Sequence, residues 1–299
     1  MVGFFLIISF DIKKRFTYIS SMNVLSLFDG LSCGQIALNR VGIKYDKYFA
    51  SEIDEYAIKV TQQNYPETIQ IGDVTQVKGS DLPQIDLIIG GSPCQGFSFA
   101  GKGLIFDDPR SALFFEFVRL VKECNPKYFL LENVKMKKEH EDVITEHMGI
   151  KPIKINSKLV SAQSRERLYW TNIPNIKQPE DKGILIKDIL DYTTEHKLLT
   201  EKGIKSQIHY AKNYKAIGKS PTLTSELAHG WGKNITPKCY IEIKAITGED
   251  RLFSPLECER LQTVPDNYTS VVSNTQRYKM LGNGWTVDVI AHIFKNIEI

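Results

Sequence analysis

The chain has 299 residues, of which 42% are hydrophobic and 24% are charged, and its formal net charge is +3. This composition is typical of a globular protein with a core of ample size, and it excludes a disordered chain or one that depends on a disulfide framework. The slight positive charge permits a nucleic-acid partner without arguing for one, so any basic face must be local.

The N-terminal stretch, MVGFFLIISF, is apolar. A run of roughly ten residues is too short to span a bilayer. It also lacks the preceding basic residues and the following small-residue cleavage site of a signal peptide. We therefore expect no membrane partner. Residues 1–21 are interpreted as an N-terminal extension of uncertain structure, because the regular pattern begins only after Met22.

From Asn23 onwards, apolar strand-like runs alternate with helix-like stretches. We predict strands over residues 23–28, 45–54, 69–74, 84–91, 127–134 and 168–173, and helices over 35–43, 55–65 and 111–125. Alternation of this kind indicates βαβ units. The predicted fold class is therefore α/β, with a doubly wound, mostly parallel sheet.

The pattern changes after about Pro174. Residues 175–250 carry shorter, more polar segments with interleaved aromatic residues, which indicates a second, smaller domain. Beyond it, Ser254, Pro255 and Glu257 have the spacing of a capped helix start. The final stretch, GNGWTVDVIAHIFKNI, predicts a Gly-rich turn and an amphipathic helix. We therefore expect a first domain over 22–174, a second over 175–250 and a C-terminal segment over 251–299.

Five cysteines are scattered along the chain without a CxxC pair, so the sequence indicates neither a zinc site nor a disulfide scaffold. We expect no metal, and most of these thiols are expected to be small buried side chains in a reducing cytoplasm. Cys94 differs, because it follows a proline in GGSPCQGFS, where a buried strand opens into a Gly- and Ser-rich loop. A thiol presented there is a candidate nucleophile.

Polar motifs follow the predicted strands: DGLSCG, SEID, GDV, SPCQG and ENV. In such sheets, ligands bind beyond the carboxyl ends of the strands. The glycine turn alone matches neither the dinucleotide fingerprint nor a P-loop. However, Glu52 follows it by about twenty residues, where a carboxylate can bind ribose hydroxyls. Asp73 ends the next strand, where it can accept a hydrogen bond from an exocyclic amine. Together these residues predict a site for a nucleoside cofactor.

Glu132 in ENV ends the strand that follows Cys94 in the sheet and should face the same pocket. A carboxylate raises the pKa of a nearby thiol, so Glu132 is better assigned to the substrate, as a proton donor or a hydrogen-bond acceptor. Arg165 and Arg167 share one face if the chain is extended, and two guanidinium groups suit a phosphate or a developing anion. If these arginines stood alone, a surface charge run would be the preferred interpretation.

The order of FDGLSCG, SEID, GDV, GGSPCQGFS, ENV, QSRER and LGNGWTV resembles the cytosine-5 DNA methyltransferase family, over residues 23–174 and 251–299. The resemblance implies a class I, Rossmann-like methyltransferase domain that binds S-adenosylmethionine. It also implies a target-recognition domain over 175–250 and a C-terminal segment that returns to the first domain. The implied cofactor pocket is lined by Phe28, Asp29, Gly30, Cys33, Gly34, Glu52, Ile53, Asp73, Val74, Pro93, Asn283, Trp285, Thr286 and Val287.

The same resemblance implies a catalytic role for four residues. Cys94 attacks C6 of a cytosine flipped out of the duplex, Glu132 holds N3 and the exocyclic amine, and Arg165 contacts the base with Arg167 as its partner. The methyl group then passes from S-adenosylmethionine to C5. Two features, the residues Ser32 and Cys33 in place of the later glycines of F-x-G-x-G-G and the GNGWTV ending, are more similar to the phage and eukaryotic de novo branch.

The implied partner is double-stranded DNA, bound by a monomer in the cytoplasm, with a gene that is bacterial or carried by a phage. SPTLTS resembles a threonine-leucine element of the family, and the candidate DNA contacts are Gln95, Ser98, Thr222, Thr224, His229, Trp231 and Lys233. For the last three, ordinary packing or a solvated loop is an equally good interpretation. The target sequence and membership of a restriction–modification system stay open.

Two other functions are compatible with these motifs. One is methylation of tRNA cytosine, because one branch of the family acts on RNA with the same motifs. That branch has a Cys-Phe-Thr signature beyond the arginine motif, whereas TNIPNIK stands in its place here. The other is a catalytically silent DNA-binding relative, which the presence of Cys94, Glu132 and Arg165 disfavours.

Overall fold

The computed structural model describes residues 22–92, 109–193, 196, 198–225 and 236–298. Within these ranges, no helix is long and apolar enough to cross a membrane. Several of the predicted site residues lie outside the described ranges, namely Pro93, Cys94, Gln95, Ser98, His229, Trp231 and Lys233.

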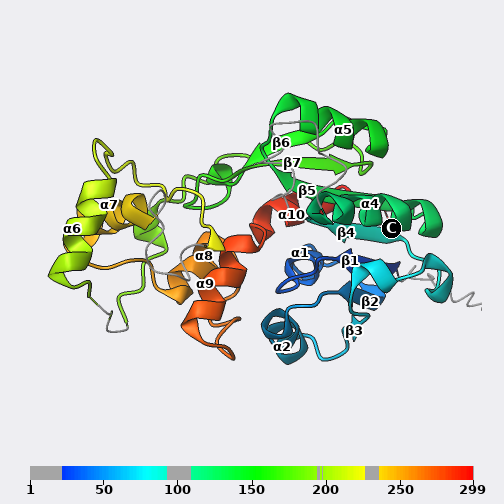
Figure 1. The fold of residues 1–299 in the computed structure, drawn as a ribbon, viewed down its shortest axis with the longest axis horizontal. Helices are drawn as coiled ribbons and strands as arrows, with labels where there is room; N and C mark the ends of the chain where they lie inside the picture. Colours follow the sequence, from blue (N-terminus) through cyan, green and yellow to red (C-terminus); the bar gives the residue numbers. More distant parts are fainter. Residues whose placement is uncertain (1–21, 93–108, 194–195, 197, 226–235, 299) are drawn as a thin grey trace, which may run out of the picture.

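A seven-stranded sheet forms the centre of the molecule, in the order β3-β2-β1-β4-β5-β7-β6 (Figure 1). Its strands are β1 (Met22–Leu27), β2 (Tyr45–Ser51), β3 (Ile69–Gln70), β4 (Leu87–Gly90), β5 (Tyr128–Val134), β6 (Ile153–Asn156) and β7 (Glu166–Thr171). Strands β1 to β5 are parallel, and β7 is antiparallel to both β5 and β6. The strand order reverses between β1 and β4, as at the switch point of a doubly wound sheet. The predicted α/β class and mostly parallel sheet are confirmed.

Helices cover both faces of the sheet. On one face lie α1 (Cys33–Arg40), α2 (Glu55–Asn64) and α10 (Val287–Phe294), and on the other lie α4 (Pro109–Cys124) and α5 (Lys138–Met148). Successive strand residues point to opposite faces. Val24 therefore packs in the core of the first face and Leu25 in the core of the second. This double burial explains why the strands are near-continuous apolar runs.

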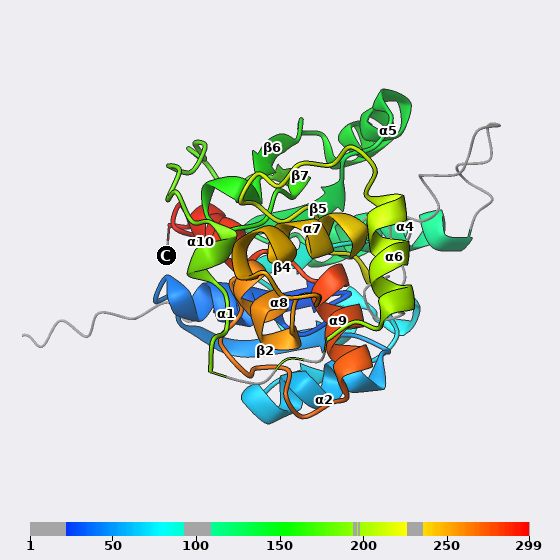
Figure 2. The same cartoon turned by 90° about the vertical axis from the view of Figure 1, so that its left-hand side faces the viewer.

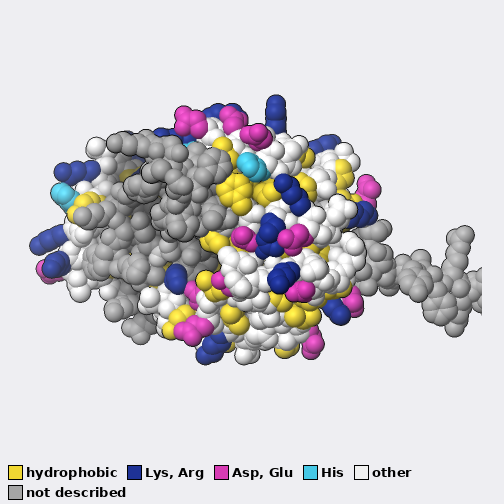
Figure 3. All heavy atoms as spheres, turned by 45° about the vertical axis from the view of Figure 1, so that its right-hand side comes forward, with side chains coloured by type: hydrophobic (Ala, Val, Ile, Leu, Met, Phe, Trp, Pro, Cys, Tyr) yellow, Lys and Arg dark blue, Asp and Glu magenta, His cyan; other side chains and the backbone are white. Residues whose placement is uncertain are grey.

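The remaining helices lie outside these layers: α6 (Glu201–Tyr210), α7 (Thr236–Thr247), α8 (Pro255–Leu261) and α9 (Asn274–Asn283). Figures 1 and 2 show α6 and α7 together at one end of the molecule, with α8 and α9 between them and the sheet. On the described part of the face in Figure 3, positive and negative side chains are interspersed, which agrees with the small net charge of +3.

Several elements differ from the sequence prediction. Two elements were not predicted: the helix α5, which is rich in charged residues and buries only His140 and Ile144, and β6, a strand of only four residues. The region expected to form a second, smaller domain contains the helices α6 and α7, for which no bounds were predicted. The third strand ends at Gln70, and Asp73 instead caps a short 3-10 helix over Val74–Gln76 by accepting a hydrogen bond from the Thr75 N–H at 2.9 Å.

The ends of α8 and α9 show how local sequence and tertiary packing compete. Ser254 and Glu257 form the predicted capping box of α8. By contrast, Gly282 lies within α9 rather than in the predicted turn. A Cβ atom added at Gly282 would lie 2.2 Å from the carbonyl carbon of Thr224, so glycine allows the backbone of residues 224–225 to contact this helix. The glycine serves a close approach between segments distant in sequence.

Candidate active site

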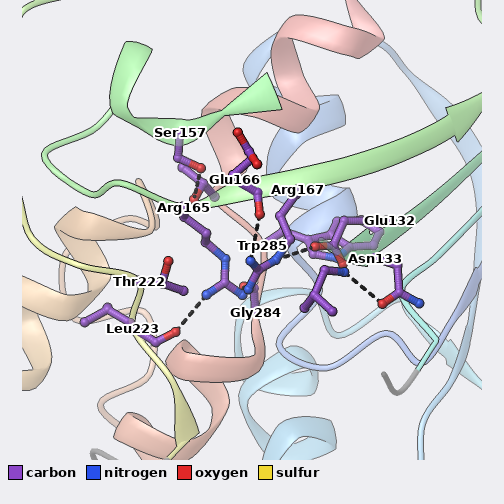
Figure 4. A network of polar contacts seen from close by, with 12 residues as sticks. Glu132, Asn133, Ser157, Arg165, Glu166, Arg167, Thr222, Leu223, Gly284 and Trp285 are labelled. Carbon is purple, nitrogen blue, oxygen red and sulfur yellow. Dashed lines mark hydrogen bonds and ion pairs between the residues drawn. The ribbon is translucent and has the colours of Figure 1, made fainter. Parts of the chain in front are cut away.

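Glu132 is the carboxylate at the centre of the candidate site, near the carboxyl end of β5 (Figure 4). Its side chain is buried, with the residue 8% exposed. Arg167 on β7 forms an ion pair with it, with 2.9 Å between Nε and Oε1. On the other side, the indole Nε1–H of Trp285 donates a hydrogen bond to Oε2 at 3.1 Å. The carboxylate is therefore held on one side by an ion pair and on the other by a hydrogen bond, from two different segments.

The residues that follow β4 are hydrogen-bonded to β5 beside Glu132. Asn133 donates from Nδ2 to the carbonyl and hydroxyl oxygens of Ser92, at 3.3 and 3.2 Å. A Cβ atom added at Gly91 would lie 2.9 Å from Trp285 Nε1 and 3.0 Å from Glu132 Oε2, so only glycine fits there. Residues 91 and 92 lead directly into Pro93 and Cys94. The described part of the chain thus brings the start of the Pro-Cys loop to the Glu132 carboxylate.

Arg165 occupies a different environment from Arg167 (Figure 4). It is 3% exposed and donates to the backbone carbonyls of Leu223 at 2.8 Å, Gly284 at 3.0 Å and Gly282 at 3.3 Å. Burial, reinforced by the charge of Arg167, lowers the pKa of its guanidinium to about 10. These contacts with the carbonyls engage both terminal nitrogens of the guanidinium. The residue precedes β7, so strand alternation does not put the two arginines in equivalent positions.

The glycine turn after β1 contacts Glu52, which follows β2. Glu52 accepts hydrogen bonds from the backbone N–H of Gly30 on Oε2 and from those of Ile53 and Asp54 on Oε1, each at 2.8 Å. These contacts hold the carboxylate beside the turn, as the spacing predicted. The apolar residue that follows Glu52, Ile53, is open to solvent, with 76% of its surface exposed.

Asp29 lies in the same turn, and only one of its two carboxylate oxygens accepts a hydrogen bond. The Tyr48 hydroxyl donates to Oδ1 at 2.9 Å, whereas the buried Oδ2 has no hydrogen-bond partner among the described residues. Burial raises the pKa of this carboxyl group to about 6, although the nearby hydroxyls of Ser26, Tyr48 and Ser32 oppose the rise. A buried acceptor without a donor is costly, so this position suits a ligand that supplies one.

The other predicted pocket residues divide into open and packed positions. Asp73 and Asn283 are exposed and Phe28 is half-buried, whereas Val74, Thr286 and Val287 are buried. A Cβ atom added at Gly34 would lie 2.3 Å from Ile89 Cδ1, so this glycine lets α1 pack closely on the sheet. The buried Cys33 thiol contacts the Trp285 carbonyl oxygen at 3.6 Å, and burial raises its pKa to about 12.

The segment around Leu223 lies against residues 162–165. Thr222 donates to the Ser164 carbonyl at 2.8 Å, and Leu223 N–H donates to Gln163 Oε1 at 2.7 Å. Thr224 has a buried hydroxyl without a partner among the described residues. The predicted contacts Thr222 and Thr224 thus lie beside the arginine motif.

Two buried residues that sequence reasoning missed support this arrangement. Gln262 donates from Nε2 to the carbonyls of Leu281 at 2.7 Å and Gly284 at 3.2 Å. Glu242 on α7 is fully buried and accepts from the Tyr214 hydroxyl at 2.6 Å and from the N–H groups of Ile217 at 2.9 Å and Gly218 at 3.0 Å. Glu242 is a polar residue within α7 and Gln262 directly follows α8, and no local motif marks either of them. Among the described residues, no group of His, Cys, Asp and Glu could hold a metal ion.

Similarity to known proteins covers nearly the whole described chain. The family model for C-5 cytosine-specific DNA methylase matches residues 22–175 and 144–298. The type II methyltransferase M1.ScrFI of Lactococcus lactis subsp. cremoris is 32% identical over 94% of this chain and 78% of its own. The orphan methyltransferase M.Rho11sI of Bacillus phage rho11s is 35% identical over 62% of this chain and 40% of its own. The solved methyltransferase EhMeth of Entamoeba histolytica is similar in fold, with a TM-score of 0.73, 18% identity and coverage of 92% and 97%.

Proposed function

Because the chain belongs to the C-5 cytosine-specific DNA methylase family and is a DNA (cytosine-5-)-methyltransferase that uses S-adenosylmethionine, we propose the following roles for its residues. Cys94 forms the covalent bond to the base, and Glu132 with Arg167 holds the base. Asp29, Glu52 and Asp73 hold the cofactor. The observation that carries this assignment is the pairing of Glu132 with Arg167 beside the start of the Pro-Cys loop.

The proposed domains follow the expected boundaries. Residues 22–174 form the catalytic and cofactor-binding domain, 175–250 recognise the target, and 251–299 return to the first domain. The contacts of Cys33 with Trp285 and the packing of α10 in the same core as α1 support the last of these. DNA is the substrate. We propose that it is bound as a duplex, by a monomer without metal, in the cytoplasm of a bacterial host.

The described residues fit S-adenosylmethionine at the turn after β1. Asp29 Oδ2 is a buried acceptor that lacks a donor, which an ammonium group would provide. Oε1 of Glu52 accepts two backbone N–H groups, whereas Oε2 accepts one and keeps a second lone pair for a ribose hydroxyl. Ile53 offers an exposed apolar surface for the face of an adenine ring, and the exposed Asp73 suits its exocyclic amine. When bound, S-adenosylmethionine supplies an electrophilic methyl group on its sulfonium.

The proposed reaction depends on a base that has left the helical stack. The Cys94 thiolate adds to C6, and the electrons of the C5–C6 double bond move towards C5 and the ring. Glu132 accepts a hydrogen bond from the exocyclic amine and donates a proton to N3, which neutralises the negative charge that develops on the ring. C5 then takes the methyl group, a base removes the C5 proton, and the bond between sulfur and C6 breaks to restore Cys94.

We assign the base contact to Arg167 and a positioning role to Arg165. The Arg167 guanidinium is next to the carboxylate that faces the base, whereas the nitrogens of Arg165 are engaged by three backbone carbonyls. Arg165 joins the segment at Leu223 to the segment at Gly284. It therefore supports both the target-recognition segment and the C-terminal edge of the pocket.

The test is transfer of labelled methyl groups to duplex DNA, with tRNA as a parallel substrate. We expect label in DNA, and we expect Cys94→Ala to abolish it. Cys124→Ala, a change at a partly buried thiol on α4, is the matched control and should keep its activity. Label in tRNA alone would overturn the assignment to DNA, and an active Cys94→Ala protein would overturn the mechanism. Bisulfite sequencing of DNA from a host expressing the gene then gives the target sequence.

A further inference from the structure

Trp285 lies between the cofactor turn and the base-binding carboxylate (Figure 4). Its backbone carbonyl accepts the Cys33 thiol of the turn at 3.6 Å, and its indole Nε1–H donates to Glu132 Oε2 at 3.1 Å. The side chain that the sequence placed in the cofactor pocket therefore faces the other reactant. Gly91 leaves the space that the indole occupies, because any Cβ atom there would lie 2.9 Å from Nε1.

We infer that Trp285 is a positioning residue that fixes the Glu132 carboxylate for the target base, an inference that rests on the proposed role of Glu132. A carboxylate held at one oxygen only can still rotate about its terminal bond. The Arg167 ion pair holds Oε1 and the Trp285 hydrogen bond holds Oε2, so the plane of the group is set by two contacts from different segments.

This fixation is compatible with base binding. A carboxyl group has about four lone-pair sites, and the Trp285 hydrogen bond and the Arg167 ion pair engage one site on each oxygen. Of the two sites that remain, one accepts a hydrogen bond from the exocyclic amine of cytosine, and the other carries the proton that is donated to N3, which is itself an acceptor. The indole ring is rigid, so little side-chain entropy is lost when its Nε1–H donates to the Glu132 carboxylate.

The first experiment compares single-turnover methyl transfer by the full chain and by Trp285→Phe, which keeps a large ring and removes the N–H. We expect the rate to fall about 10- to 100-fold, the range for losing a hydrogen bond to a charged group. The dissociation constant for S-adenosylmethionine should change less than about threefold, because the lost bond is to Glu132. Trp170→Phe is the matched control, since it removes an indole N–H that donates to Thr145 at 3.0 Å, and it should keep the wild-type rate.

Combination with Glu132→Gln tests whether Trp285 acts through Glu132. In the Glu132→Gln background, Trp285→Phe should change the residual rate less than about threefold. A Trp285→Phe protein with the wild-type rate, a defect confined to cofactor affinity, or a fully additive double variant would each overturn the inference.

A spectroscopic measurement does not depend on turnover. The chain has three tryptophans, and their indole ¹H–¹⁵N resonances can be assigned by single substitutions. Glu132→Gln should shift the Trp285 indole signal and leave that of Trp170 in place. An unshifted Trp285 signal would overturn the inference even if the protein methylates DNA. A shifted signal in a protein that does not methylate DNA would overturn the proposed function alone.

Discussion

Replacing Asp29 by Asn should make the protein more stable at neutral pH and less able to bind its cofactor. The substitution keeps an oxygen that accepts the Tyr48 hydroxyl and removes the buried charge. In the wild type, burial raises the pKa of the Asp29 carboxyl from 3.8 to about 6. The folded chain therefore holds this proton more tightly than the unfolded chain does.

The sign of the pH effect follows from that difference. Between about pH 4 and pH 6 the folded state binds more protons than the unfolded state, so the free energy of unfolding falls as the pH rises. The stabilising contribution is complete below pH 4 and is lost once the pH passes 6. A shift of about two units corresponds to about 3 kcal/mol. The new amide leaves a buried N–H without an acceptor, which costs about 1 kcal/mol.

We therefore expect Asp29→Asn to be about 2 kcal/mol more stable than the wild type at pH 7.5, and about 1 kcal/mol less stable at pH 4. Urea unfolding at four pH values between these limits measures the difference, with circular dichroism and fluorescence required to coincide. Because other charges are shared by both proteins, their contributions cancel in the difference. A stability difference that is constant with pH would refute the reasoning.

Tyr48→Phe provides a matched perturbation of the same carboxylate. The Tyr48 hydroxyl opposes the rise in the Asp29 pKa, so its loss should raise that pKa further and extend the fall in stability to higher pH. Calorimetric titration with S-adenosylmethionine completes the test. Asp29→Asn should bind it at least about tenfold more weakly, since a charge-assisted hydrogen bond is lost.

Four further predictions concern contacts that support the fold and the site. Arg165→Met should lower the free energy of unfolding by about 3 kcal/mol, because three carbonyls lose their donor. Arg167→Gln should instead lower the single-turnover rate about 100-fold with little change in melting temperature; the reverse pattern would restore Arg165 as the base contact. Glu242→Gln should cost about 2 to 3 kcal/mol in urea unfolding, because an amide NH₂ would face one of its donors, and an unchanged midpoint would contradict this role. Ser254→Ala should cost about 1 kcal/mol through the lost cap, and a neutral result would mean that the capping box adds nothing.

The central sheet was predictable because its strands are buried on both faces and read as apolar runs. The start of α8 was predictable because Ser254 and Glu257 cap it locally. By contrast, α5 was missed because its charged sequence buries few residues. The turn predicted at Gly282 was wrong, because this glycine allows a close contact with the backbone of residues 224–225. A contact between segments so far apart in the sequence cannot be predicted from the local residue pattern.

In the candidate site, too, locally encoded features were predicted and long-range contacts were not. Glu52 was found because the spacing from the glycine turn has a local meaning, and the structure brings its carboxylate to Gly30. The environment of Arg165 depends on residues 58 to 119 positions away. The orientation of Trp285 depends on Glu132, 153 positions away. Long-range partners of this kind are invisible to a motif.

The bond between Cys33 and Trp285 also has a consequence for how the protein is made. The two residues are 252 positions apart. Ribosomes add roughly 5 to 20 residues per second, so the turn after β1 waits about 10 to 50 s for its partner. During that interval α1 lacks α10, and its apolar face has no cover from the end of the chain. A nascent chain therefore completes its cofactor edge only with its last helix, so a ribosome-bound enzyme stays inactive on nearby DNA until synthesis is nearly finished.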